Sequence, residues 1–237
     1  MKNKLIVALD VPELAKAQEL VNTLGETVNY YKVGLELFLN TRGEVLDFLK
    51  AKDKKVFLDL KFHDIPNTIT QAAKWAAGLG VDMFNVHASG GEVMLATTME
   101  TVKNSAVNNG YTPPLVIGVT VLTSFDEVSF NKVGFKYSID ETVLHWSQLC
   151  QKAGLDGVVC SPREAANIKS VCGNEFITVC PGVRPCWTEL QDQKRITTPG
   201  EAIKMGADYL VVGRPITKNS NPCQAALRII KEMEGEE

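Results

Sequence analysis

Short runs of apolar, largely β-branched residues alternate along this chain with longer stretches in which apolar residues recur at helical spacing. Continuous apolar runs of about four to eight residues are typical of strands that are buried on both faces, as in parallel sheets. We expect such strands at residues 5–9, 29–33, 55–60, 82–87, 115–122, 157–160, 176–180 and 209–212.

A helical pattern follows each expected strand. The first helix is expected to open at Pro12, with an apolar stripe formed by Leu14, Ala17, Leu20, Val21 and Leu24. Further helices are expected near residues 41–51, from 66 to about 79, from 91 to about 107, near 141–153, after 162, and near 199–205 and 222–233. Eight strand–helix units predict an α/β fold, a single (β/α)8 TIM barrel spanning residues 1–237. A doubly wound open sheet is the alternative, but near-equal repeats favour barrel closure.

Composition narrows the classes of function. The 237 residues are 45% hydrophobic and 22% charged, and the formal net charge is −3. This charge gives no general attraction to nucleic acid or to an anionic membrane, and we expect neither as a partner. No apolar run is suited to spanning a membrane, and residues 5–9 are too short for the core of a signal peptide. We therefore expect a cytoplasmic protein.

Six cysteines and three histidines are the obvious candidate soft metal ligands. No Cys-x-x-Cys pair occurs, so we expect no structural zinc site. Cys160 and Cys180 lie in apolar runs, where cysteine commonly behaves as a small hydrophobe. Reduced thiols are the expected state in the cytoplasm.

Polar residues interrupt the pattern where the expected strands end, which is where (β/α)8 barrels place their chemistry. They are Asp10, Lys32, Asp59, Lys61, Asp64, His87, Thr123, Ser124, Arg184 and Arg214. Several have structural alternatives. Asp10 suits either a helix cap or a contact to a ribose hydroxyl, and Thr123 and Ser124 suit either a cap or a ligand hydroxyl. We expect a structural role for His87. His63 is expected to support the site from beside it, and His145 is expected on one face of a helix.

The stretch Asp59-Leu60-Lys61-Phe62-His63-Asp64 stands out among these positions. Strand side chains alternate between faces, so Asp59 and Lys61 are expected on the same side. Two carboxylates around an ammonium are costly to bury unless the charges are paired. Alone, this motif indicates a structural ion pair, but the other polar residues at the same rim favour a functional site.

The last two loops suggest a phosphate site. Gly213 permits close backbone approach, and Arg214 can add charge-assisted hydrogen bonds to a phosphate. The alternative is a turn glycine followed by a surface cation. The loop between residues 181 and 195 is long and polar, which is typical of a segment that closes over a ligand.

Residues 59–68 closely resemble the signature of the orotidine 5′-phosphate decarboxylase family, in its bacterial form. The similarity extends to Ala8-Leu9-Asp10, Lys32-Val33-Gly34, Val86-His87-Ala88, Leu122-Thr123-Ser124, Pro181-Gly182-Val183-Arg184-Pro185, Asp192-Gln193-Lys194-Arg195 and Val212-Gly213-Arg214-Pro215. The Asp-x-Lys-x-x-Asp core alone also occurs in sugar-phosphate decarboxylases and aldolases, including relatives that need a divalent metal. The extension through Asn67-Thr68 and the phosphate-loop segment are more specific.

The resemblance implies conversion of orotidine 5′-phosphate to uridine 5′-phosphate and carbon dioxide, the last step of UMP synthesis, without a metal or organic cofactor. It also implies a homodimer with shared active sites. By that similarity Lys61 donates a proton to C6 of the pyrimidine. The other implied site residues are Lys32 and Asp59 in the charged array, Asp64 and Thr68 from the partner subunit, Asp10 at the ribose, Thr123 at the base, and Arg184, Gln193, Gly213 and Arg214 toward base and phosphate.

The chain departs from the family in the loop after the seventh strand. Trp187 and Gln191 stand where relatives commonly have glycines. Loop length is preserved, so we expect the phosphate contact to persist. The closing movement of the loop is expected to depend on these two positions, because glycine has more conformational freedom than its replacements.

Overall fold

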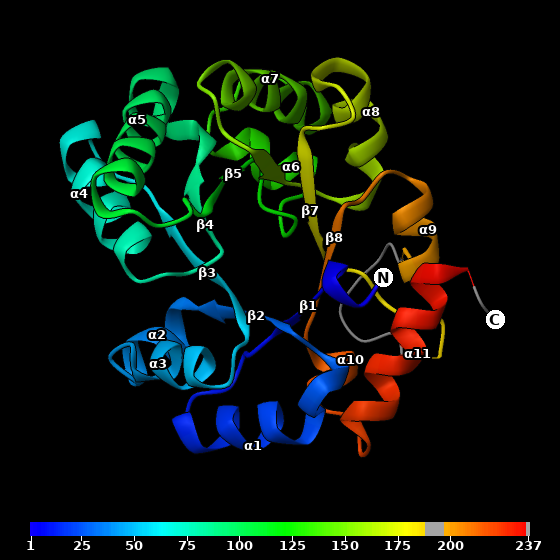
Figure 1. The fold of residues 1–237 in the computed structure, drawn as a ribbon. Coiled ribbons are helices and arrows are strands. Elements are labelled where there is room, and N and C mark those ends of the chain that lie inside the picture. The colour runs from blue at the N-terminus through cyan, green and yellow to red at the C-terminus, as the bar shows by residue number, and fades with distance from the viewer. Residues whose placement is uncertain (188–196, 236–237) are drawn as a thin grey trace. The chain divides into compact units, whose positions relative to one another are not determined.

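A computed structural model describes residues 1–187 and 197–235 (Figure 1). In these ranges eight strands follow one another in chain order around a closed parallel barrel. The strands are β1 (Leu5–Ala8), β2 (Tyr30–Gly34), β3 (Lys55–Phe62), β4 (Met83–His87), β5 (Leu115–Val119), β6 (Gly157–Val159), β7 (Ile177–Pro181) and β8 (Tyr209–Val212). The predicted (β/α)8 fold is confirmed.

Helices connect the strands. They are α1 (Leu14–Leu24), α2 (Leu35–Asn40), α3 (Glu44–Ala51), α4 (Pro66–Gly78), α5 (Gly91–Asn109), α6 (Glu127–Lys132), α7 (Ile139–Lys152), α8 (Pro162–Cys172), α9 (Pro199–Lys204), α10 (Arg214–Thr217) and α11 (Pro222–Glu234). Short 3-10 turns occupy Lys2–Lys4, Gly25–Thr27 and Ala88–Gly90. In the described ranges, no helix is both long enough and apolar enough to cross a membrane.

Contacts within the chain group it into two compact units. The first unit joins residues 1–60 to residues 180–237, and in it β1 pairs in parallel with both β2 and β8. The second unit comprises residues 61–179, where β4, β5, β6 and β7 pair in sequence. Helix α1 lies beside α11 in the first unit, and α4 lies beside α5 in the second (Figure 1). The expectation of a single domain stays a prediction.

The first strand is as apolar and as buried as its sequence predicted. All of β1 is buried, and Leu5, Ile6 and Val7 are 0% exposed. A parallel strand covered on both faces has no solvent side, which explains the continuous apolar run. Cys160 and Cys180 are also fully buried, so both occupy core positions as expected of small apolar side chains.

Three connections contain a short helix that was not expected from the sequence. The first is α2, which precedes the helix expected at residues 41–51; that expected helix is α3, which begins at Glu44 after the N-cap Gly43, whose φ is +87°. The second difference is α6, an added helix in the connection after β5. The third is α10, a single turn that follows β8 immediately.

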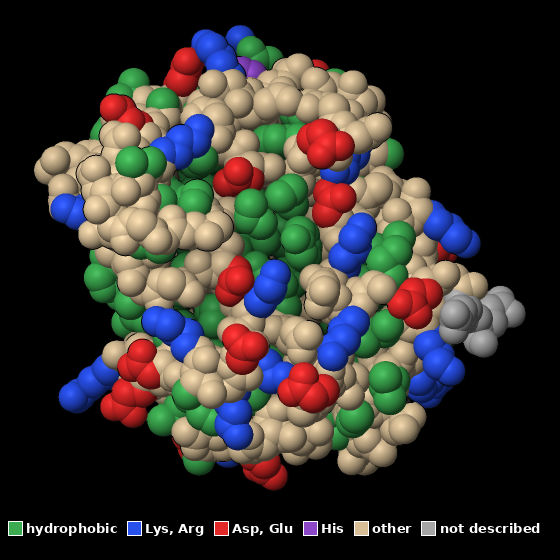
Figure 2. All heavy atoms as spheres, in the orientation of Figure 1, with side chains coloured by type: hydrophobic (Ala, Val, Ile, Leu, Met, Phe, Trp, Pro, Cys, Tyr) green, Lys and Arg blue, Asp and Glu red, His purple; other side chains and the backbone are tan. Residues whose placement is uncertain are grey.

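Charged side chains of both signs are interspersed on the face drawn in Figure 2. A surface that binds nucleic acid by its backbone usually presents a continuous stripe of Lys and Arg. No such stripe is drawn on this face.

Gly157 gives a test of how tightly β6 packs on β7. It pairs with Ile177, and a Cβ added at Gly157 would lie 2.1 Å from the Ile177 carbonyl oxygen. A backbone atom cannot move aside as a flexible side chain can. We therefore expect Gly157→Ala to lower the free energy of unfolding by about 1–3 kcal/mol or more, measured by urea denaturation.

Gly78→Ala is the matched control. Gly78 ends α4, its φ is not in the left-handed region, and an added Cβ would meet nothing within 4 Å. Its replacement should leave stability unchanged or raise it by up to about 1 kcal/mol. Equal effects of the two substitutions would contradict the β6–β7 packing.

Candidate active site

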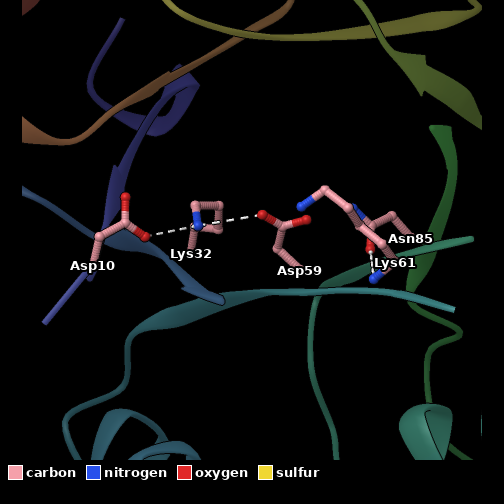
Figure 3. A network of polar contacts seen from close by, with 5 residues as sticks. All are labelled: Asp10, Lys32, Asp59, Lys61 and Asn85. Atoms are coloured by element: carbon pink, nitrogen blue, oxygen red, sulfur yellow. Dashed lines mark hydrogen bonds and ion pairs between the residues drawn. The ribbon is translucent and has the colours of Figure 1, made fainter. Parts of the chain in front are cut away.

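Lys32 of β2 connects two carboxylates that come from the strands on either side of β2 (Figure 3). Its Nζ lies 3.0 Å from Oδ1 of Asp10, which follows β1, and 3.2 Å from Oδ2 of Asp59 in β3. The side chains of Lys32 and Asp59 are 12% and 11% exposed, whereas that of Asp10 is 62% exposed. The structure thus brings together three of the residues that the sequence singled out, with Asp10 at the solvent side.

The two carboxylates keep the Lys32 ammonium charged despite its burial. Burial is the largest single influence on the pKa of Lys32 and lowers it. The negative charges and hydrogen bonds of Asp59 and Asp10 together outweigh burial and raise the pKa of Lys32 above its ordinary value. Lys32 is therefore a fixed cation that orients Asp59 rather than a group that exchanges protons near neutral pH.

Asp10 does not cap a helix. Helix α1 begins at Leu14, two residues later than expected, and its N-cap is Glu13, which makes no side-chain cap. The capping alternative for Asp10 is wrong, because its carboxylate is engaged by Lys32 instead.

Two glycines leave space around the Asp10 carboxylate. A Cβ added at Gly34 would lie 3.2 Å from Lys32 Nζ and 3.8 Å from Asp10 Oδ1. A Cβ added at Gly213 would lie 3.4 Å from Asp10 Oδ2. Neither glycine has a positive φ, so their role here is to leave volume free rather than to permit an unusual backbone. The close approach of a phosphate to the backbone at Gly213 stays a prediction.

Lys61 has an unusual backbone. Its φ is +52°, in the left-handed region, although it lies within β3. This conformation costs an L-residue about 1–2 kcal/mol. The regular alternation of strand side chains does not hold at such a residue, so the direction of the Lys61 side chain does not follow from its spacing to Asp59. Their placement on one face stays a prediction.

Asn85 accepts a hydrogen bond from this backbone. Its Oδ1 accepts a hydrogen bond from the backbone N–H of Lys61 at 2.8 Å, and the residue is 1% exposed in the middle of β4 (Figure 3). A buried N–H without an acceptor costs about 1–3 kcal/mol. Asn85 was not among the residues that stood out in the sequence. The available signal was an asparagine inside an apolar strand, where asparagine is depleted.

Asp64 and Thr68 lie at the start of α4 and are exposed. Asp64 Oδ1 accepts a hydrogen bond from the backbone N–H of Ile65 at 2.6 Å, and α4 has no side-chain cap. Ile65 between them is 65% exposed. These residues are therefore available to a ligand or to another chain.

The connection after β5 carries Thr123 and Ser124 in an exposed turn. They do not cap the following helix, because Asp126 and Ser129 form the capping box of α6. The capping alternative is wrong for both residues. His145 is exposed on α7, as its expected helix-face position requires, and the rings of His63 and His87 lie 5.3 Å apart.

The loop after β7 is described only in part. Arg184 is 6% exposed, and its backbone N–H donates to the carbonyl of Thr197 at 3.0 Å. The guanidinium of Arg228 in α11 lies 4.4 Å from the ring centroid of Trp187, in cation–π geometry. Gln191 and Gln193 lie outside the described residues.

Arg214 begins α10, directly after Gly213. In the described parts of the chain, no group of three or more His, Cys, Asp or Glu side chains gathers closely enough to hold a metal ion. The acidic residues Asp10 and Asp59 are engaged by Lys32.

Replacing Lys61 tests its left-handed backbone. Glycine adopts this region without penalty and alanine does not, so Lys61→Gly should be more stable than Lys61→Ala by about 1 kcal/mol. Urea denaturation of the two variants measures the difference. The same pair of changes at Lys55, which is exposed at the start of β3 with an ordinary strand backbone, should give the reverse order. Alanine as the more stable residue at both positions would contradict the conformation of Lys61.

Comparison with known proteins gives consistent matches along the chain. The profile of the orotidine 5′-phosphate decarboxylase / HUMPS family matches residues 3–229. A solved structure of orotidine 5′-phosphate decarboxylase from Lactobacillus acidophilus superposes with a TM-score of 0.85 at 35% identity, covering 98% of this chain and 99% of that one.

Curated relatives are more similar still in sequence. Orotidine 5′-phosphate decarboxylase of Nostoc sp. is 47% identical over 235 residues, covering 98% of this chain and 97% of the relative. That of Syntrophotalea carbinolica is 49% identical over 232 residues, covering 98% and 95%. Because the profile and the relatives each span nearly the whole chain, this protein belongs to the orotidine 5′-phosphate decarboxylase / HUMPS family.

Proposed function

We propose that this protein converts orotidine 5′-phosphate to uridine 5′-phosphate and carbon dioxide, as the last step of UMP synthesis. The observation that carries the proposal is 47% identity, over 98% of the chain, to a protein named for this reaction. The residues at the ends of the first three strands support it, because they supply the fixed charges that the chemistry needs.

Decarboxylation breaks the bond between C6 and the carboxylate and leaves the electron pair on C6, in an sp² orbital that the ring does not delocalise. In our proposal the Lys61 ammonium stabilises that pair and then transfers a proton to C6, giving uridine 5′-phosphate. Lys61 is left neutral and regains its proton from water. An ammonium already in place needs little reorganisation during the reaction, which is how preorganised charges favour a transition state.

Asp59 completes the charged array in this proposal, and its position is the best supported part. Lys32 lies 3.2 Å from Asp59 Oδ2, and both side chains are largely buried. A carboxylate held in this way keeps its orientation while a substrate binds. Asp10 is more exposed and accepts a hydrogen bond from Lys32 through one oxygen, so it suits a contact to a ribose hydroxyl.

The remaining contacts follow the resemblance. We assign Thr123 to the base, and Arg184, Gln193, Gly213 and Arg214 toward the base and the phosphate. The space beside Gly213 and the charge of Arg214 support a phosphate there. Phosphate lies far from C6, so its binding energy can serve to order the reacting end.

We further propose a cytoplasmic homodimer whose sites are shared, with Asp64 and Thr68 acting in the partner's site. Both residues are exposed at the start of α4, and the apolar Ile65 between them is exposed as well. These features support a protein partner at this surface. In the proposal, no metal or organic cofactor takes part.

The direct test follows the ultraviolet spectrum of orotidine 5′-phosphate with metal-stripped protein. We expect the wild-type protein to convert the substrate fully. Lys61→Ala should fold and bind uridine 5′-phosphate but lose turnover by about a thousandfold, because a general acid contributes on the order of 10²–10⁴.

Two results would change the assignment. Activity that appears only after a divalent metal is restored would favour the metal-dependent sugar-phosphate chemistry of related proteins. Folded wild-type protein that binds the nucleotide without any spectral change would indicate a catalytically silent phosphate-binding barrel. Near-normal turnover by Lys61→Ala would remove the proton-donor assignment while leaving the reaction itself in place.

Gly34→Ala tests the role of the Lys32 ion pairs. The added methyl group would lie 3.2 Å from Lys32 Nζ, and a flexible side chain can move a few tenths of an ångström away. Stability should change by less than about 1 kcal/mol, while kcat should fall about tenfold, since small misplacements of catalytic charges are costly.

Gly78→Ala, which adds a methyl group to open space in α4, serves as the control and should keep full activity. Unchanged kcat in folded Gly34→Ala would show that the position of Lys32 is not critical for turnover.

A further inference from the structure

Asn85 is a neutral side chain that the charged array does not include. It lies in β4, opposite Ile117 of β5, among the apolar neighbours Phe84 and Val86. It is 1% exposed, and burying a carboxamide is unfavourable unless its polar atoms are hydrogen-bonded. An apolar residue would fill this strand position at lower cost. The hydrogen-bond partner of the Asn85 amide should therefore explain why an asparagine lies at this position.

The side chain of Asn85 binds a backbone group. Its Oδ1 accepts the backbone N–H of Lys61 at 2.8 Å, across 24 residues of sequence (Figure 3). Lys61 has a φ of +52°, whereas a residue in a parallel strand has a φ near about −120°. Rotation about N–Cα moves Cβ relative to the strand, so this φ determines where the Lys61 side chain leaves the backbone.

We propose that Asn85 is a positioning residue for Lys61: its carboxamide oxygen holds the Lys61 backbone in the left-handed conformation and so fixes the direction of the Lys61 ammonium. This inference rests on the proposed function, in which Lys61 is the proton donor. Asn85 itself does not touch the substrate in this proposal. It acts by keeping Lys61 in one orientation before substrate binds.

A positioning role and a purely structural role of Asn85 have different effects on kcat. Loss of a core amide with no positioning role lowers stability but leaves the folded enzyme as active as before. Loss of a positioning contact lowers kcat while substrate binding is retained, because Lys61 acts in the chemical step. It also changes the backbone conformation at Lys61, which can be observed without any assay of turnover.

The test uses full-length Asn85→Leu, which keeps the branching at Cγ but removes the acceptor. We expect kcat for orotidine 5′-phosphate to fall about a hundredfold, as for a catalytic group displaced by about 1 Å, with KM and uridine 5′-phosphate affinity little changed. The Lys61 amide should exchange with deuterium faster than in the wild type, and its Cα and Cβ chemical shifts should move toward strand values. Asn85→Ala serves as a second variant if Asn85→Leu does not fold.

Ser147→Ala is the matched control. Ser147 is 0% exposed in α7 and donates to the carbonyl of Val143 at 2.8 Å, so its loss also removes a buried polar group in the second unit. It should leave kcat and the Lys61 shifts unchanged.

Each outcome decides the proposal. Wild-type kcat in a folded Asn85 variant, or unchanged exchange and shifts at Lys61, would overturn the positioning role. If neither variant folds, the wild-type exchange rate decides, and a Lys61 amide that exchanges as fast as in an unfolded chain overturns the proposal. A wild-type protein without decarboxylase activity would instead overturn the proposed function, and the exchange and shift data would still show whether Asn85 controls the Lys61 backbone.

Discussion

The candidate site depends on keeping a buried ammonium paired on both sides. Lys32 has little contact with water, and removing one partner of a buried ion pair typically costs about 3–5 kcal/mol. The register of β2 and β3 explains how the pairing is made. Gly34, not Lys32, lies opposite Asp59, so Lys32 reaches the carboxylate diagonally past a residue without a side chain. The charge of Lys32 and the absence of a side chain at Gly34 are thus parts of one arrangement.

Glycine acts in this site mainly by leaving volume. Positions for a Cβ at Gly34 and at Gly213 both lie within 4 Å of the Asp10 carboxylate, from two different strand ends. Side chains at either position would crowd the exposed acid that is proposed to meet the ribose. A phosphate and a ribose can therefore approach the backbone closely here, which fits the proposed binding of a nucleotide. Conformational freedom, the usual reason for a glycine, is not needed at these two positions.

The strands were predictable from sequence because burial on both faces leaves a continuous apolar run that few other structures require. The connections were less predictable, since their short helices depend on local turns. Helix α2 was not expected, and Gly43, with its left-handed backbone, lies between it and the expected helix α3. Asp126 and Ser129 start α6 with a capping box inside a segment that reads as an irregular connection. The starts and ends of these short helices depend on backbone conformation, which the pattern of apolar residues does not predict.

The same distinction applies to the site. Charged residues such as Asp10, Lys32 and Asp59 were visible in the sequence, because a charge at the end of an apolar strand is costly and therefore conspicuous. Asn85 was not singled out, since a neutral amide in a strand is a weaker signal and its partner is a backbone N–H 24 residues away. The left-handed φ of Lys61 is equally hidden, because nothing in the identity of a lysine favours it. A strained conformation persists where the surrounding structure over-determines it, and such strain concentrates at functional sites. The hydrogen bond from Lys61 to Asn85 is one part of the surroundings that fix this conformation, and it lies at the residue to which the chemistry is assigned.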